Sequence, residues 1–145
     1  MTIEVGPDDI KLRDETYRLL RASPAHARAA LARLATLDSP FQFMTREADG
    51  LTLLLAEDDV RALGDLLADA TREPDAYRVV TFTPMLPWNL IGFMARVANV
   101  LASEGVPLGA VSAYDRDHVF VRDELAERAV SALRREAADG GLVPD

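Results

Sequence analysis

The chain of 145 residues contains no cysteine and only two histidines. The absence of cysteine excludes disulfides, thiolate nucleophiles and thiolate metal sites together. His26 and His118 are far apart in the sequence, and no cluster of acidic residues stands at ligand spacing beside them, so we expect no metal site. There is also no nucleophile elbow, phosphate-binding glycine loop or histidine dyad at a supporting spacing. We therefore expect no catalytic residues, no enzyme activity and no cofactor.

Long hydrophobic runs and positive charge are scarce as well. No apolar stretch approaches the ~20 residues that a membrane span requires, and the N-terminus lacks the basic and apolar regions of a secretory signal. We expect a cytoplasmic protein with no membrane partner. The 16 basic residues stand against 24 acidic ones, a net charge of −8. A nucleic-acid partner needs a cationic face, so the charge argues against one.

The remaining composition is that of a folded globular protein, with 49% hydrophobic and 28% charged residues. This length allows one ordinary domain or two very small ones. Only one of the basic residues is a lysine, a codon bias that indicates a GC-rich bacterial genome.

The two halves of the chain repeat. The segment DETYRLLRASP (Asp14–Pro24) aligns with PDAYRVVTFTP (Pro74–Pro84) at an offset of 60, and Phe41–Thr45 aligns with Leu108–Ser112 at an offset of 67. The same order of elements at a near-constant offset indicates a duplication. It predicts an N-terminal unit in residues 1–72 and a C-terminal unit in residues 73–145.

Hydrophobic periodicity and turn residues predict strand, helix, strand, strand, helix in each half. In the first half these are Tyr17–Ala22, Pro24–Leu37, Phe41–Thr45, Leu51–Ala56 and a helix that begins at Asp58 or Asp59. In the second half they are Tyr77–Thr83, Trp88–Glu104, Leu108–Tyr114, His118–Val121 and Asp123–Ala138. The pattern predicts an α+β fold of two tandem ferredoxin-like βαββαβ units, with antiparallel sheets and helices on one face. The N-terminal pieces Ile3–Val5 and Ile10–Leu12 are candidates for the strand that the repeat lacks.

The segment LPWNLIGFMARVANVLASEGVPLGAVSAYDRDHVFVRDEL, from Leu86 to Leu125, resembles the ACT domain family. The resemblance is to tandem ACT proteins of the CASTOR arginine-sensor type and to small bacterial stand-alone ACT proteins. It rests on these positions: Gly92, Leu101, Ala102, Gly105, Val106, Ser112, Tyr114, Asp117, Val119 and Val121. Phe41–Val60 resembles the family less well, because Glu47–Gly50 departs from its pattern.

The resemblance implies a regulatory protein, often a homodimer, that binds a small molecule, most often an amino acid, at an interface between units. The loop after the first strand and the start of the next helix hold the ligand in that family. The residues that this implies here are Thr83, Met85, Leu90, Ile91, Gly92, Ser112, Ala113, Tyr114 and Asp115. Physical chemistry agrees, because a helix N-terminus offers unpaired N–H groups to a carboxylate. Asp115 is suited to pair with an α-ammonium group.

Other interpretations of these residues stay open at this stage. Gly92 also suits a close packing contact, Ser112 is ordinary in a strand, and Asp115 is favoured in a hairpin corner for its turn geometry. In a second hypothesis Trp88, Phe93 and Met94 plug the site, and the protein serves dimerisation or partner docking without a ligand.

Overall fold

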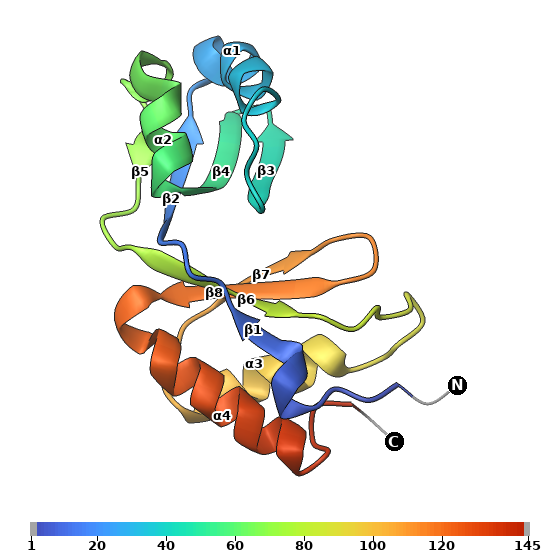
Figure 1. Cartoon of the computed structure of the whole chain (residues 1–145). Coiled ribbons are helices and arrows are strands. Elements are labelled where there is room, and N and C mark those ends of the chain that lie inside the picture. Colours follow the sequence, from blue (N-terminus) through green and yellow to red (C-terminus); the bar gives the residue numbers. More distant parts are fainter. Residues whose placement is uncertain (1–2, 144–145) are drawn as a thin grey trace. The chain divides into compact units, whose positions relative to one another are not determined.

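The structure is a computed structural model that describes residues 3–143 (Figure 1). These residues form two compact units, one made by Glu15–Tyr77 and the other by residues 3–14 together with 78–143. Both are α+β units with an antiparallel sheet. Within the described part of the chain, no helix has the length and apolar character needed to cross a membrane.

The N-terminal unit is a four-stranded sheet with the order β3-β4-β2-β5. Its elements are β2 (Tyr17–Ala22), α1 (Pro24–Leu34), β3 (Gln42–Glu47), β4 (Gly50–Ala56), α2 (Glu57–Leu63), the 3₁₀ turn η2 (Gly64–Leu67) and β5 (Thr71–Arg72). Every second residue of β4 is a leucine that packs against the helices, together with residues of β2. The core between sheet and helices includes Leu20, Leu53, Leu55, Ala30 and Leu34. This is the arrangement that the period-2 strands and the alanine-rich helix predict.

The C-terminal unit has the strand order β1-β6-β8-β7. Its elements are η1 (Pro7–Asp9), β1 (Ile10–Leu12), β6 (Tyr77–Phe82), α3 (Phe93–Ser103), β7 (Gly109–Ser112), β8 (Asp117–Arg122), η3 (Asp123–Leu125) and α4 (Ala126–Ala138). Helices α3 and α4 pack on one face of the sheet (Figure 1), where Val80, Phe82, Val119, Val97 and Leu133 share a core.

The fourth strand of the C-terminal unit comes from the beginning of the chain. Strand β1 pairs antiparallel with β6, with Ile10 opposite Phe82 and Leu12 opposite Val80. An arginine of α4 holds this strand from the helix side, because the Arg134 guanidinium donates to the Ile10 carbonyl at 2.9 Å. Of the two candidate pieces, Ile10–Leu12 is therefore the strand, and it completes the second repeat. The division of the chain at residues 72 and 73 follows the repeat, and as a statement about domains it stays a prediction.

The ends of several elements differ from those expected. Helix α1 ends at Leu34 and not at Leu37, because the next residues close 3₁₀-type turns, with the Thr36 and Leu37 N–H groups donating to Arg33 and Leu34. The prediction that β7 reaches Tyr114 was wrong, since the strand ends at Ser112. A hairpin bond from the Ala113 N–H to the Arg116 carbonyl closes the turn there.

The largest error concerns the helix after β6. It begins at Phe93 and not at Trp88. Gly92 has φ 90°, a left-handed conformation that stops the helix from extending further toward the N-terminus. A turn between the Pro87 carbonyl and the Leu90 N–H takes up the preceding residues. Leu90 and Ile91 consequently lie in a loop.

Candidate ligand-binding site

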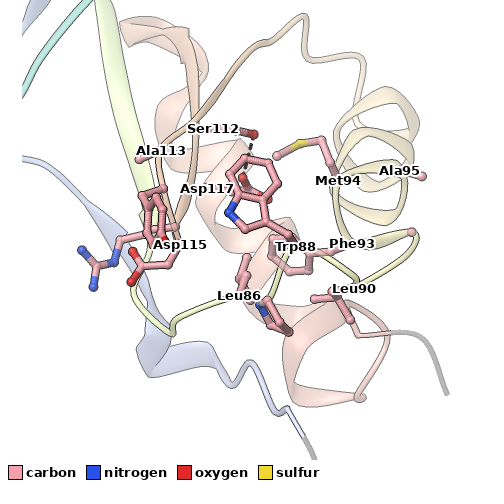
Figure 2. A pocket seen from close by; sticks show the side chains of 14 residues that line it. Leu86, Trp88, Leu90, Phe93, Met94, Ala95, Ser112, Ala113, Asp115 and Asp117 are labelled. Carbon is pink, nitrogen blue, oxygen red and sulfur yellow. Dashed lines mark hydrogen bonds between the residues drawn. The ribbon is translucent and has the colours of Figure 1, made fainter.

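A cavity of about 280 Å³ opens in the C-terminal unit between two stretches of chain (Figure 2). One is the loop from β6 into α3 with the first turn of that helix, and the other is the hairpin turn between β7 and β8. The lining residues are Leu86, Pro87, Trp88, Leu90, Gly92, Phe93, Met94, Ala95, Ser112, Ala113, Tyr114, Asp115, Arg116 and Asp117. All of them belong to one unit, so the cavity is a feature of that unit alone.

Two hydrogen bonds fasten the loop to the hairpin turn. The Leu86 N–H donates to the Asp115 carbonyl at 2.6 Å, and Nε of Arg116 donates to the Thr83 carbonyl at 3.2 Å. The first half of the loop is therefore held in place, and the Arg116 guanidinium is engaged by Thr83, which does not line the cavity.

The start of α3 forms one wall. The first intrahelical bond runs from the Arg96 N–H to the Gly92 carbonyl at 3.0 Å. The N–H groups of Phe93, Met94 and Ala95 therefore have no partner within the helix, and no side chain caps them. The positive end of the helix dipole lies at the same place. This wall is suited to an anion such as a carboxylate.

The opposite wall carries the polar side chains. The Ser112 hydroxyl donates to Oδ1 of Asp117 at 2.8 Å, drawn as a dashed line in Figure 2. The Asp115 side chain also lines the cavity. Among the described lining residues there is no histidine, lysine or cysteine. The two walls together suit a molecule that has both a negatively and a positively charged group.

The apolar residues proposed as plugs divide into two kinds. Phe93 is buried in the core and packs edge-on against Phe82, with ring centroids 5.1 Å apart. Trp88 is 74% exposed, and Met94 is half-buried against the core. Within one chain these side chains leave the cavity open.

Six of the nine residues predicted to bind a ligand line the cavity: Leu90, Gly92, Ser112, Ala113, Tyr114 and Asp115. Thr83, Met85 and Ile91 are not among the lining residues. Thr83 faces the N-terminal segment, where its N–H donates to the Asp9 carbonyl at 2.9 Å. Met85 and Ile91 are 70% and 83% exposed. That any of the nine binds a ligand stays a prediction.

The sequence reasoning left out several lining residues. Asp117 stood in the family pattern, and Trp88 was one of the plugs in the second hypothesis, so both carried a signal. Leu86 and Arg116 carried none, because their role depends on the hydrogen bonds that close the loop onto the turn.

A buried polar chain lies beside this site. Nε of Arg13 donates to the Thr81 hydroxyl at 3.0 Å, and the Thr81 hydroxyl lies 2.9 Å from Nδ1 of His118. Since the arginine can only donate, the hydroxyl proton is free to point to Nδ1, which then accepts. Burial lowers the pKa of His118 to about 4, and the positive charges of Arg13 and Arg116 act in the same direction. His118 is thus neutral at pH 7.

No group of three or more His, Asp, Glu or Cys side chains in residues 3–143 could hold a metal ion.

In the N-terminal unit, the buried carboxylate of Asp59 accepts from Ser39 Oγ at 2.6 Å and from Gln42 Nε2 at 3.1 Å. These bonds tie α2 to the segment before β3 and to the first residue of β3.

The N-terminal unit is built differently at the equivalent position. Strand β2 ends at Ala22 and α1 begins at Pro24, so Ser23 alone joins them. Ten residues, 83–92, separate β6 from α3. A Cβ added at Gly50 would lie 2.4 Å from the Ala22 carbonyl oxygen, so the hairpin of this unit lies directly against the end of β2.

Residues 72–135, which include the entire cavity, match the family model for the ACT domain. A comparison with curated proteins finds no match. Among solved structures, a Vibrio cholerae protein of unknown function, described as a possible transport protein, is 25% identical with a TM-score of 0.67. That alignment covers 90% of this chain and 89% of the other.

Two further solved structures with a similar fold are described as parts of aspartate kinases. The alpha and beta subunits of an aspartokinase give a TM-score of 0.70 at 14% identity, covering 94% of this chain and 99% of that one. The ligand-free regulatory subunit of Thermus thermophilus aspartate kinase gives 0.60 at 17% identity, covering 87% and 95%. The chain therefore has the ACT-type fold of two tandem ferredoxin-like units, as predicted.

Proposed function

We propose that this protein is a regulatory protein without catalytic activity, and that it binds a free amino acid in the cavity between the start of α3 and the β7–β8 turn. The observation that carries the proposal is the pairing of two complementary walls. The uncapped N–H groups of α3 suit an α-carboxylate, and the Asp115 side chain suits an α-ammonium group. The surrounding Leu90, Phe93 and Met94 provide apolar surface for a side chain.

The comparisons support this proposal at the level of the class. The cavity lies within the segment that matches the ACT domain model, and two solved structures with the same fold are described as regulatory parts of aspartate kinases. The amino acid itself, the CASTOR-type resemblance and a cytoplasmic location stay predictions.

A thermal-shift screen with each of the twenty amino acids at millimolar concentration tests the proposal. At 100 times its dissociation constant, a ligand that binds only the folded state adds about 2.7 kcal/mol to the free energy of unfolding. We expect at least one amino acid to raise the melting temperature. A screen in which none does so would contradict the proposal.

A second candidate function is an interaction module, and one observation favours it. The large hydrophobic side chains that are exposed in the described chain are Met85, Trp88, Ile91 and Tyr114, all at or beside the cavity. Clustered exposed apolar side chains are typical of interaction sites. In this alternative a second copy of the chain covers and plugs the cavity in a homodimer. A ligand-independent dimer whose stability no amino acid changes would favour this function over the first.

A further inference from the structure

The loop that borders the cavity has fixed ends and an unattached middle. At its beginning, Thr83 and Leu86 are bonded to the rest of the unit through Asp9, Arg116 and Asp115. At its end, Phe93 is 3% exposed in the core. Residues 87–91 lie between these anchors, and their hydrogen bond among the described residues is internal, from the Leu90 N–H to the Pro87 carbonyl at 3.0 Å.

The side chains of this middle part are the second observation. Trp88 lines the cavity and yet is 74% exposed, and Ile91 is 83% exposed. Leu90 is half-buried against the core and limits how far residues 87–91 can move. An indole at a cavity mouth has a large apolar surface to bury. The loss of conformational entropy on burial is small, because the side chain has only two rotatable bonds.

From these observations we infer that residues 87–91 form a flap that closes over an amino acid bound in the cavity, with Trp88 as the residue that covers it. The inference rests on the proposed function. Gly92 is placed to act as one hinge, because its φ of 90° lies in a region that glycine enters freely. The bond between Leu86 and Asp115 marks the other end. Closure transfers the Trp88 indole from solvent to the ligand and excludes water from the charged walls.

The chain contains a single tryptophan, so its fluorescence reports on Trp88 alone. The experiment adds the amino acid with the largest thermal shift in the screen and records the emission maximum and the quenching by acrylamide. We expect a shift of emission to shorter wavelength and a severalfold loss of quenching. A raised melting temperature with unchanged emission and quenching overturns the flap and leaves the proposed function standing. The absence of any thermal shift overturns both.

The affinity of two variants separates the flap from simple surface packing. Trp88→Ala should weaken binding of the same amino acid at least about tenfold by calorimetry, whereas Trp88→Phe keeps an aromatic cover and most of the affinity. Met85→Ala is the matched control: Met85 is 70% exposed in the same loop, but it precedes the Leu86 anchor and does not line the cavity. Equal losses for Trp88→Ala and Met85→Ala would overturn the inference.

A second copy of the chain could instead cover Trp88 without any ligand. Light scattering and acrylamide quenching of the ligand-free protein decide this point. We expect strong quenching at every protein concentration. Quenching that falls as a dimer forms, with no further change on adding the amino acid, would overturn the flap.

Discussion

His118, in the buried polar chain of the C-terminal unit, makes the free energy of unfolding depend on pH. Its pKa is about 4 in the folded protein, against 6.5 for a free histidine. The unfolded chain therefore binds more protons between these two values, and the free energy of unfolding decreases as pH falls through this window. The stabilisation is complete above pH 6.5, and the loss levels off below pH 4 at a value on the order of 3 kcal/mol.

Urea unfolding at pH 7.0 and at pH 4.5 measures this loss. His118→Gln keeps a polar side chain near Thr81 but does not titrate, so we expect its stability to change less between the two pH values. His26→Gln, which leaves His118 in place, is the control and should keep the loss. Parallel profiles for the wild type and His118→Gln would show that His118 has no such role.

Alanine substitutions at Gly92 and Gly105 separate the cost of backbone strain from an effect on ligand binding. Gly92 and Gly105 have φ of 90° and 71°, and a Cβ at Gly105 would meet no atom within 4 Å. Each Gly→Ala change should lower the free energy of unfolding by about 1–2 kcal/mol, because L-residues are strained in the left-handed region. Only Gly92→Ala should also reduce the thermal shift produced by an amino acid. An equal reduction of the thermal shift in Gly105→Ala would mean that Gly92 has no specific role in binding.

Among the elements, β1 offers the sharpest test of the fold. Ile10 is fully buried in the core of the C-terminal unit, while its neighbour Lys11 is exposed. Ile10→Ala should lower the stability of that unit by about 2–5 kcal/mol, since it removes buried methyl groups and leaves a cavity. Lys11→Ala should change it by less than about 0.5 kcal/mol. Urea unfolding of both variants measures the difference, and equal small effects would mean that β1 does not complete the sheet.

The same elements separate what the sequence could predict from what it could not. Strands such as Tyr17–Ala22 were found because their period and flanking turn residues agree with the fold. The pairing of β1 with β6 was open, since it joins residues about 70 positions apart and a three-residue strand has almost no periodicity. The helix after β6 was predicted to begin too early because Leu90 fits the apolar stripe of α3, although the left-handed Gly92 keeps the helix from starting before Phe93.

The candidate site follows the same division. Gly92, Ser112 and Asp115 were predicted because a resemblance placed the loop opposite the turn, and the cavity lies there. Thr83, Met85 and Ile91 were included because they belong to the loop, but Thr83 is bonded to Asp9 and the side chains of Met85 and Ile91 are exposed to solvent. Arg116 was missed because its bond to the Thr83 carbonyl exists only after both segments fold together.

At the scale of the whole molecule, the two repeated units have unequal loops, and this predicts the stoichiometry of binding. Only the C-terminal unit has the ten-residue connection whose residues line the cavity. In the N-terminal unit Ser23 alone joins β2 to α1, and the ion pair of Arg21 with Asp49, at 3.2 Å, lies at the hairpin. There is no comparable loop to form a wall or a flap.

Calorimetric titration with the amino acid that gives the largest thermal shift should therefore yield one bound molecule per chain. Asp115→Asn should weaken this binding about tenfold, because it removes the charge that we propose pairs with the α-ammonium group. Asp65→Asn changes the net charge by the same amount at an exposed residue of the N-terminal unit that does not line the cavity, and it should leave the affinity unchanged. Two bound molecules per chain would mean that the long loop does not define the binding site. Equal effects of the two substitutions would mean that Asp115 does not pair with the ligand.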